Sequence, residues 1–117
     1  MQTKIKIEYG FINIENDVIA RLAGIAVMEC AGVVGMAAMN MRDGIVQLLK
    51  RESLVRGVKV ENTEDALIIS LHVIVEYGIN INAIANTLQG NVKYALEETT
   101  GISINEVNIY VEGIRVE

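Results

Sequence analysis

One stretch constrains the fold more than any other, because no other run is so apolar and so β-branched: Ala66 to Gly78, ALIISLHVIVEYG. In an extended chain, successive side chains point to opposite faces. One face is then entirely apolar, with Leu67, Ile69, Leu71, Val73 and Val75, and the other is mixed, with Ile68, Ser70, His72, Ile74 and Glu76. This pattern predicts a strand in the interior of an antiparallel sheet that has helices on one side only.

After Tyr77-Gly78 the apolar period changes from 2 to 3.6, which predicts an amphipathic helix. Its inner stripe is Ile81, Ile84, Ala85, Leu88, Val92, Ala95 and Leu96, and its outer face is Asn82, Asn86, Gln89, Lys93 and Glu97. Gly101 has the position of a carboxy-terminal cap. A last strand is expected from Ile104 to Glu112, with Val107, Ile109 and Val111 buried and a change of phase at Gly113.

The amino-terminal third predicts a strand followed by a helix. Residues Lys4 to Ile14 alternate, but the apolar phase slips beside Gly10, as at a β-bulge. Asn16 or Asp17 can cap a helix that runs to about Cys30. Ala20, Ala23 and Gly24 give this helix a small-residue side, so it is either covered on two sides within the chain or half covered by a partner.

The next segment predicts a connection and a short helix. Gly32 to Gly35 would end the first helix and lead into a methionine-bearing connection with Met36, Met39 and Met41. Asp43 would cap a short helix from Gly44 to Arg51. Val55 to Glu61 reads as a strand joined to the Ala66–Gly78 strand as a hairpin through the turn residues 62–65.

The expected order is therefore strand, helix, short helix, strand, strand, helix, strand. This order predicts an α+β two-layer sandwich: a four-stranded, mainly antiparallel sheet with its helices on one face. The length of 117 residues suits a single domain covering residues 1–117.

Composition excludes several classes of function. The formal net charge of −5 disfavours binding to a phosphate backbone. No apolar run approaches the 18 or so residues that span a bilayer, and no leader opens the chain, which predicts a soluble cytoplasmic protein without direct membrane insertion. The one cysteine, Cys30, lies in an apolar segment and is expected to be a buried, inert thiol.

The sequence holds no reactive constellation. His72 is the only histidine, so one chain cannot build a histidine-based metal cage or a histidine-paired nucleophile. It is expected near Ser70 and Tyr110 as a hydrogen-bonded surface residue. The acidic residues are spread along the chain and form no matched acid and base. We therefore predict no catalytic residue, no metal and no cofactor.

The segment Gly32-Val33-Val34-Gly35 leaves one alternative open. The K-homology fold of nucleic-acid binders also places a Gly-x-x-Gly loop between two helices, where it clamps a nucleotide backbone. Lys50, Arg51 and Arg56 would then supply positive charge. Two valines at the loop centre and the acidic net charge argue against this reading, which leaves a helix stop followed by a buried turn.

The whole pattern resembles the alkaline shock protein family of Gram-positive bacteria, also called envelope stress response proteins, in its short YloU-like branch. The resemblance extends from Tyr9 to Val116 and rests on the following segments, in this order: Gly10–Ile14, Val18-Ile19, Ala23, Gly32–Met36, Asp43-Gly44, Arg56–Val60, Ile74–Gly78, Val92–Tyr94, Thr100-Gly101 and Val107–Val111. It implies a cytoplasmic protein without known catalytic activity. Some relatives are held under the membrane by a small integral-membrane protein and help the cell to tolerate alkaline or envelope stress.

We therefore expect a non-enzymatic protein that associates with itself and acts as a scaffold or adaptor for protein partners. Its partner surfaces would be the small-residue helix side, the methionine segment or the polar face of the sheet. The candidate contact residues are Met36, Met39, Met41, His72 and Tyr110. The alternative is a K-homology-like module that binds nucleic acid through Gly32–Gly35.

Overall fold

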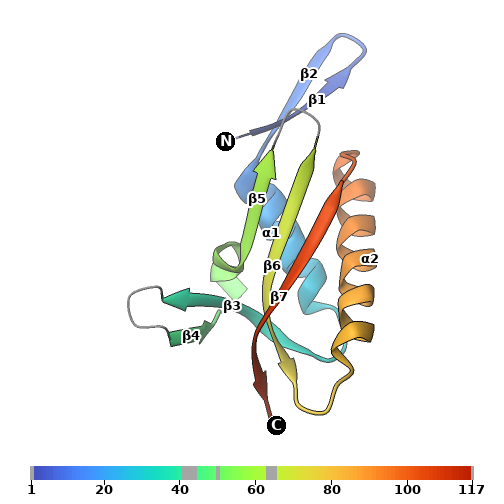
Figure 1. Cartoon of the computed structure of the whole chain (residues 1–117). Coiled ribbons are helices and arrows are strands. Elements are labelled where there is room, and N and C mark those ends of the chain that lie inside the picture. The colour runs from blue at the N-terminus through green and yellow to red at the C-terminus, as the bar shows by residue number, and fades with distance from the viewer. Residues whose placement is uncertain (1, 41–44, 50, 63–65, 117) are drawn as a thin grey trace.

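Strand β6 (Leu67–Glu76) lies at the centre of the main sheet in the computed structural model (Figure 1). The structure describes residues 2–40, 45–49, 51–62 and 66–116. The other elements are β1 (Gln2–Ile7), β2 (Gly10–Glu15), α1 (Asn16–Met28), β3 (Val33–Asn40), β4 (Ile45–Leu48), the 3-10 helix η1 (Arg51–Gly57), β5 (Val58–Asn62), α2 (Ile81–Thr100) and β7 (Glu106–Arg115).

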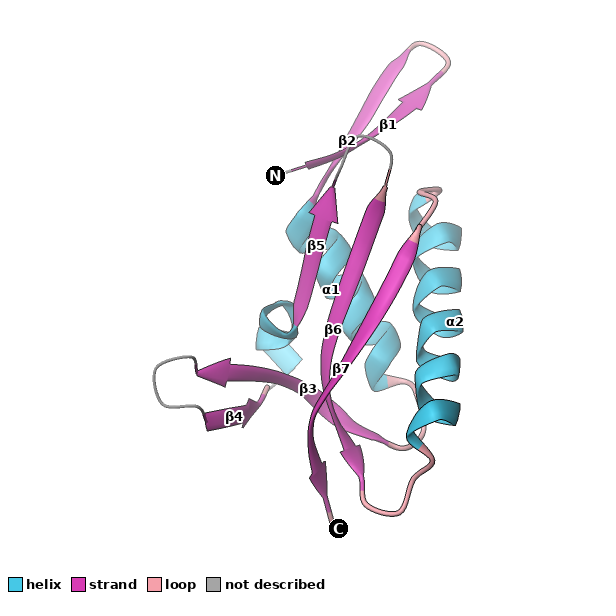
Figure 2. Ribbon diagram, in the orientation of Figure 1, coloured by secondary structure: helices cyan, strands magenta, loops and turns pink. Residues whose placement is uncertain are grey.

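The two faces of β6 follow the predicted alternation. Leu67, Ile69, Leu71, Val73 and Val75 are all buried in the core. Helices α1 and α2 both lie on this side of the sheet (Figure 2). They contribute Ile19, Ala23, Val27, Ile84, Leu88, Val92 and Leu96 to the same core. The α+β prediction with helices on one face is confirmed.

The main sheet is mixed but mostly antiparallel. β5 and β3 pair antiparallel with successive parts of β6, and β4 pairs antiparallel with β3. β7 pairs parallel with β6, because helix α2 crosses over between the two strands. The β6–β7 register shifts where Gly113 pairs with Ile74, so the predicted change of phase at Gly113 is confirmed.

Helix α2 has the limits that its sequence predicts. The Asn80 side chain accepts a hydrogen bond from the Ala83 backbone N–H at 3.1 Å and so caps the first turn. Gly101 ends the helix with a φ of 75°, a left-handed conformation that glycine adopts without strain. Ile84, Leu88, Val92 and Leu96 are buried, whereas Ile81 is exposed at the amino-terminal end.

The predicted first strand is wrong, because residues 2–15 form a separate hairpin. β1 and β2 pair antiparallel from Gln2↔Glu15 to Ile7↔Gly10 and turn at Glu8-Tyr9. A turn, like a bulge, changes the phase of an apolar alternation, so the slip beside Gly10 marks a reversal of the chain. The hairpin projects from the end of the main sheet (Figure 1).

The predicted connection and short helix before β5 are also wrong. Residues 33–40 form strand β3, and residues 45–48 form strand β4, which pairs with Ala37–Asn40. A segment as short as Ile45–Leu48, with three apolar residues, fits either a helix or a strand, so its spacing alone does not discriminate between them. The chain then forms η1, and β5 begins at Val58, three residues later than expected. The β5–β6 hairpin pairing is confirmed.

Helix α1 differs from its prediction at both ends. Its N-cap is Glu15, whose side chain makes no capping hydrogen bond, and its last residue is Met28. Cys30 is buried, as predicted, and the Asn91 amide donates to its sulfur at 3.2 Å. Gly24 lies against η1, since a methyl group added there would stand 3.0 Å from Leu54 Cβ. The small-residue side is thus covered within the chain and is not a partner surface.

Candidate functional site

The candidate functional site is the face of the sheet opposite the helices, which we call the open face. It receives alternate side chains from three neighbouring strands: Lys59 and Glu61 from β5, Ile68, Ser70, His72, Ile74 and Glu76 from β6, and Glu106, Asn108, Tyr110 and Glu112 from β7. Ser70 and Ile74 are buried even here. The remaining groups form a surface that is mainly polar and acidic.

His72 lies at the middle of the open face in a cluster with two β7 residues. The parallel register pairs His72 with Tyr110, and their rings stack at 4.9 Å between centroids and 13° between planes. The Nδ1–H of His72 donates to Glu112 Oε1 at 2.8 Å. His72 and Glu112 are partly buried, and Tyr110 is exposed. The predicted position of His72 beside Tyr110, as a hydrogen-bonded residue, is confirmed.

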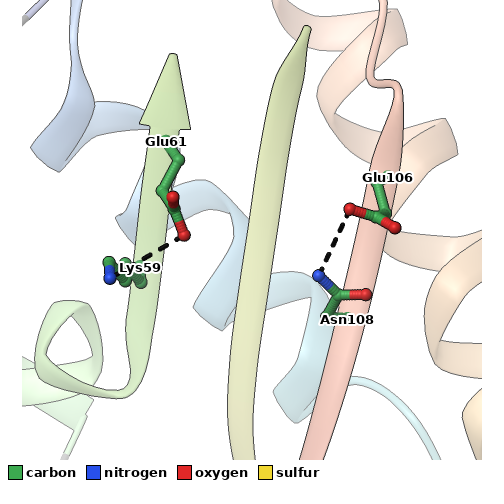
Figure 3. A network of polar contacts seen from close by, with 4 residues as sticks. All are labelled: Lys59, Glu61, Glu106 and Asn108. Carbon is green, nitrogen blue, oxygen red and sulfur yellow. Dashed lines mark hydrogen bonds and ion pairs between the residues drawn. The ribbon is translucent and has the colours of Figure 1, made fainter. Parts of the chain in front are cut away.

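Two polar contacts flank the central strand on the same face (Figure 3). On β5, Lys59 Nζ stands 3.8 Å from Glu61 Oε1. On β7, the Asn108 amide donates to Glu106 Oε2 at 3.5 Å. In both contacts the two residues lie two positions apart on one strand, so each strand satisfies its own polar side chains and leaves them accessible.

The arrangement suits recognition better than reaction. Ser70 is the hydroxyl nearest to His72 along β6, but it is buried and therefore shielded from a substrate. No group of three or more His, Cys, Asp or Glu side chains capable of holding a metal ion occurs among residues 2–40, 45–49, 51–62 and 66–116. His72, Tyr110 and Glu112 do not line the clefts beside Gln89 of α2, Ile25 of α1 or Tyr77 after β6. A stacked aromatic pair and a row of carboxylates on a sheet instead offer stacking and hydrogen-bonding groups to a partner.

Of the three predicted methionine contacts, Met36 is the one whose side chain the structure describes. Met36 is completely buried in β3, opposite Val73, so its prediction as a contact residue is wrong. The backbone of Met39 lies in β3, where it pairs with Val46. Met41 lies outside the described residues. Filling of the interior by Met36 agrees with the ordinary role of methionine as an adaptable core residue.

The alternative prediction, in which Gly32–Gly35 form a loop that clamps a nucleotide backbone, is wrong. Gly32 occupies a turn with a φ of 88°, and Val33 already begins strand β3. Val34 follows in the strand, and the β3–β6 register shifts between Val33 and Gly35. Because a strand follows this segment instead of a helix, the K-homology arrangement is absent there.

Of the three basic residues of that alternative, Arg56 is the one whose side chain the structure describes. Lys50 lies outside the described residues, and of Arg51 only its backbone, at the start of η1, is described. Arg56, near the end of η1, is exposed. One exposed arginine does not make the basic patch that phosphate binding requires.

Sequence reasoning missed an apolar surface on the amino-terminal hairpin. Ile7, Tyr9, Phe11 and Ile12 are all exposed there, and Tyr9 at the turn keeps 93% of its surface. Ile5 and Ile14 are only partly buried against the core. The alternation Ile5, Ile7, Tyr9, Phe11 is the available signal, but it fits a strand inside the main sheet equally well.

Pattern, fold and surface together describe a small α+β domain with an open polar sheet face and a projecting hairpin. The chain belongs to the alkaline shock protein family, described as having a cell envelope-related function, whose model matches residues 4–116. No solved structure matches it at a significant level. No helix within the described ranges is long and apolar enough to cross a bilayer.

Three relatives illustrate the family. The chain is 41% identical to YloU of Bacillus subtilis, over 99% of this chain and 98% of YloU. It is 34% identical to Spy1614 of Streptococcus pyogenes serotype M6, over 99% of this chain and 97% of that protein. It is 25% identical to a Streptococcus pyogenes serotype M3 protein named stress response regulator gls24 homolog, over 91% of this chain and 59% of that protein.

Proposed function

We propose that this protein is a non-enzymatic component of the envelope stress response that associates with itself and docks other proteins. The envelope-related description of its family and the stress-response name of one relative support the biological context. The partners would be a second copy of the chain and other proteins. One of these other proteins would be a small membrane protein that holds this chain at the membrane.

The exposed hairpin carries this proposal. A hairpin of two strands is marginally stable in water by itself, because little apolar surface is buried between them. Here Tyr9, Phe11 and Ile12 are exposed on such a hairpin, whose contacts with the rest of the domain are mainly those of β2 with α1. Exposed apolar groups gathered on one projecting element are typical of a docking site.

The open face of the sheet also supports the proposal. It presents a stacked histidine and tyrosine with a bonded carboxylate, and these groups do not line the clefts named above. Such a surface fits an extended protein contact better than a transformed metabolite. The nucleic-acid alternative depended on a Gly32–Gly35 loop, but Val33 to Gly35 lie in strand β3.

A hairpin variant tests the docking function. Tyr9→Ser with Phe11→Ser removes two exposed aromatic side chains and should leave the fold unchanged. In a deletion strain, the wild-type gene should restore growth after an alkaline or cell-wall challenge, and the variant should not. If the variant restores growth fully, the hairpin is not needed for the function. If the deletion strain grows as well as the wild-type strain under the challenge, the stress role is refuted.

A matched control separates loss of docking from loss of an aromatic group. Tyr94→Ser removes an exposed tyrosine from the outer side of α2, far along the chain from the hairpin. It should behave as wild type in growth. Affinity capture from cells should recover the same partner protein with the wild type and with Tyr94→Ser. The hairpin variant should fail to recover it.

A further inference from the structure

The outer edge of β7 has no neighbouring strand among the described residues, and near one end the Gln89 amide of α2 donates to its Val107 carbonyl at 3.0 Å. β6 pairs with β7 from Glu106 to Arg115, and none of the described strands pairs with the other edge of β7 (Figure 1). Natural proteins usually protect such edges with proline, lysine, a central bulge or a very short strand. β7 is ten residues long, it contains neither proline nor lysine, and its irregularity falls near Gly113, towards its end.

We propose that this edge pairs with the β7 edge of a second copy, antiparallel, about a two-fold axis at Tyr110. The inference rests on the self-association proposed above and names the surface that performs it. Edge-to-edge pairing supplies affinity through main-chain hydrogen bonds, as in other complexes built by strand addition. An isologous contact of this kind closes at two copies and leaves no edge of β7 open.

The direction of the main-chain groups limits the possible registers. Odd-numbered residues of β6 turn their main-chain groups towards β7, since the Leu67 carbonyl accepts from the Asn105 N–H and the Tyr77 N–H donates to the Arg115 carbonyl. In a parallel ladder with Ile69 opposite Val107, the even-numbered residues of β7 then turn theirs towards β6. The groups of Val107, Ile109 and Val111 therefore point outward, and the Val107 carbonyl accepts from the Gln89 amide of α2. An antiparallel pairing must place these odd-numbered residues opposite one another.

Charge selects between the two most extensive registers. An axis at Ile109 would set Glu106 opposite Glu112 of the second copy, and like charges directly opposite are destabilising. An axis at Tyr110 sets Asn108 opposite Glu112 of the second copy, where an amide can donate to a carboxylate. It also sets Ile109 opposite Val111, so apolar groups meet on the helix side. About four hydrogen bonds would join the strands, two for each of the two Ile109–Val111 pairs.

A cleft at the same edge fits the remainder of the second strand. The cleft measures about 320 Å³ and is lined by Gln89 and Lys93 of α2 and by residues 104–108. The Tyr110 register carries the end of the second copy's strand over this cleft. Ile114 and Val116, which are 53% and 79% exposed in one chain, would be covered there. Arg115 of the second copy would come next to Glu106.

Two edge variants and one control test the proposal by sedimentation equilibrium over a concentration series. Ile109→Pro removes an outward N–H and spares the pairing with β6, and Tyr110→Lys brings two like charges together at the axis. Each should raise the dimer dissociation constant at least about tenfold. Tyr94→Lys, at a tyrosine that is 68% exposed on α2, should leave the constant unchanged. Circular dichroism verifies that each variant is folded, and Tyr110→Lys suffices if Ile109→Pro is not.

The outcomes distinguish this inference from the proposed function. Dimers that are weakened by both edge variants and not by the control support the β7 interface. An oligomer that neither edge variant weakens overturns the interface and leaves self-association standing. A wild-type chain that stays monomeric at high micromolar concentration overturns both.

A cysteine variant tests the register itself. Tyr110→Cys places a new thiol on the axis, while the native Cys30 is buried and protected from reaction. Oxidation with diamide should join two Tyr110→Cys chains through a disulfide, because residues directly opposite in such a pair lie within disulfide reach. Tyr94→Cys should remain largely uncrosslinked at the same concentration. Equal crosslinking of the two variants would refute the axis at Tyr110.

Discussion

Gly32→Ala is the sharpest test of how the chain leaves helix α1 and enters β3. Gly32 has a φ of 88°, in the left-handed region that L side chains rarely adopt. A methyl group added there would stand 2.5 Å from Ile84 Cδ1 and 2.9 Å from Ile79 Cδ1. Alanine would therefore be strained in its backbone and crowded in its surroundings.

Gly78→Ala separates these two costs. Gly78 has nearly the same φ, 86°, but a methyl group added there would have no neighbour within 4 Å. The backbone strain of about 1–2 kcal/mol should appear in both variants. Only Gly32→Ala adds the cost of crowding a filled core, about 1–3 kcal/mol, at the lower end if the isoleucine ends can move. We expect Gly32→Ala to lose about 2–5 kcal/mol and Gly78→Ala about 1–2 kcal/mol.

Urea unfolding followed by circular dichroism measures the free energy of unfolding of both variants and of the wild type. A difference of 1 kcal/mol also lowers the melting temperature by about 4 °C in a domain of this size. Equal losses in the two variants would refute the close approach of Gly32 to α2. If Gly32→Ala is as stable as the wild type, Gly32 does not have the left-handed conformation that this turn requires.

Three further substitutions test the core, a helix cap and the open face. Leu88→Ala empties a fully buried site of α2 and should cost about 2–5 kcal/mol in urea unfolding. Asn80→Ala removes the α2 cap and should cost about 1 kcal/mol, whereas Asn82→Ala, exposed in the first turn, should cost less than half of that. Glu112→Ala removes the carboxylate bonded to His72 and should slightly destabilise the fold, by about 1 kcal/mol or less. The His72 ring resonances should shift in NMR spectra, and unshifted resonances would contradict that contact.

The parts of the fold that sequence predicts correctly are those whose pattern is long. β6 extends over ten residues and α2 over twenty, so each repeats its period often enough to exclude the other structure. The Gly101 end of α2 follows from local chemistry, because a left-handed glycine acts within one turn. The His72–Tyr110 neighbourhood follows from strand alternation alone.

The errors fall where several structures share one pattern. Residues 4–14 fit a bulged strand or a hairpin, and residues 45–49 fit a short helix or a strand. Pairing decided both: Ile5 lies opposite Ile12, and Ala37 lies opposite Leu48. The burial of Met36 and of the Gly24 side of α1 likewise depends on β6 and η1, which are distant in sequence.

The sequence by itself determined a central strand with one apolar face, the helix that covers it, and a chemistry without a histidine-based site. These properties depend on residue type and on periods of 2 or 3.6, which neighbouring residues define. Only the tertiary structure decided that the first residues leave the sheet as a hairpin, that Val33–Asn40 form a strand in which Met36 is buried, and that no described strand pairs with the outer edge of β7. Each of these depends on which distant segments pair. The local sequence does not specify the partner strand of a backbone hydrogen bond.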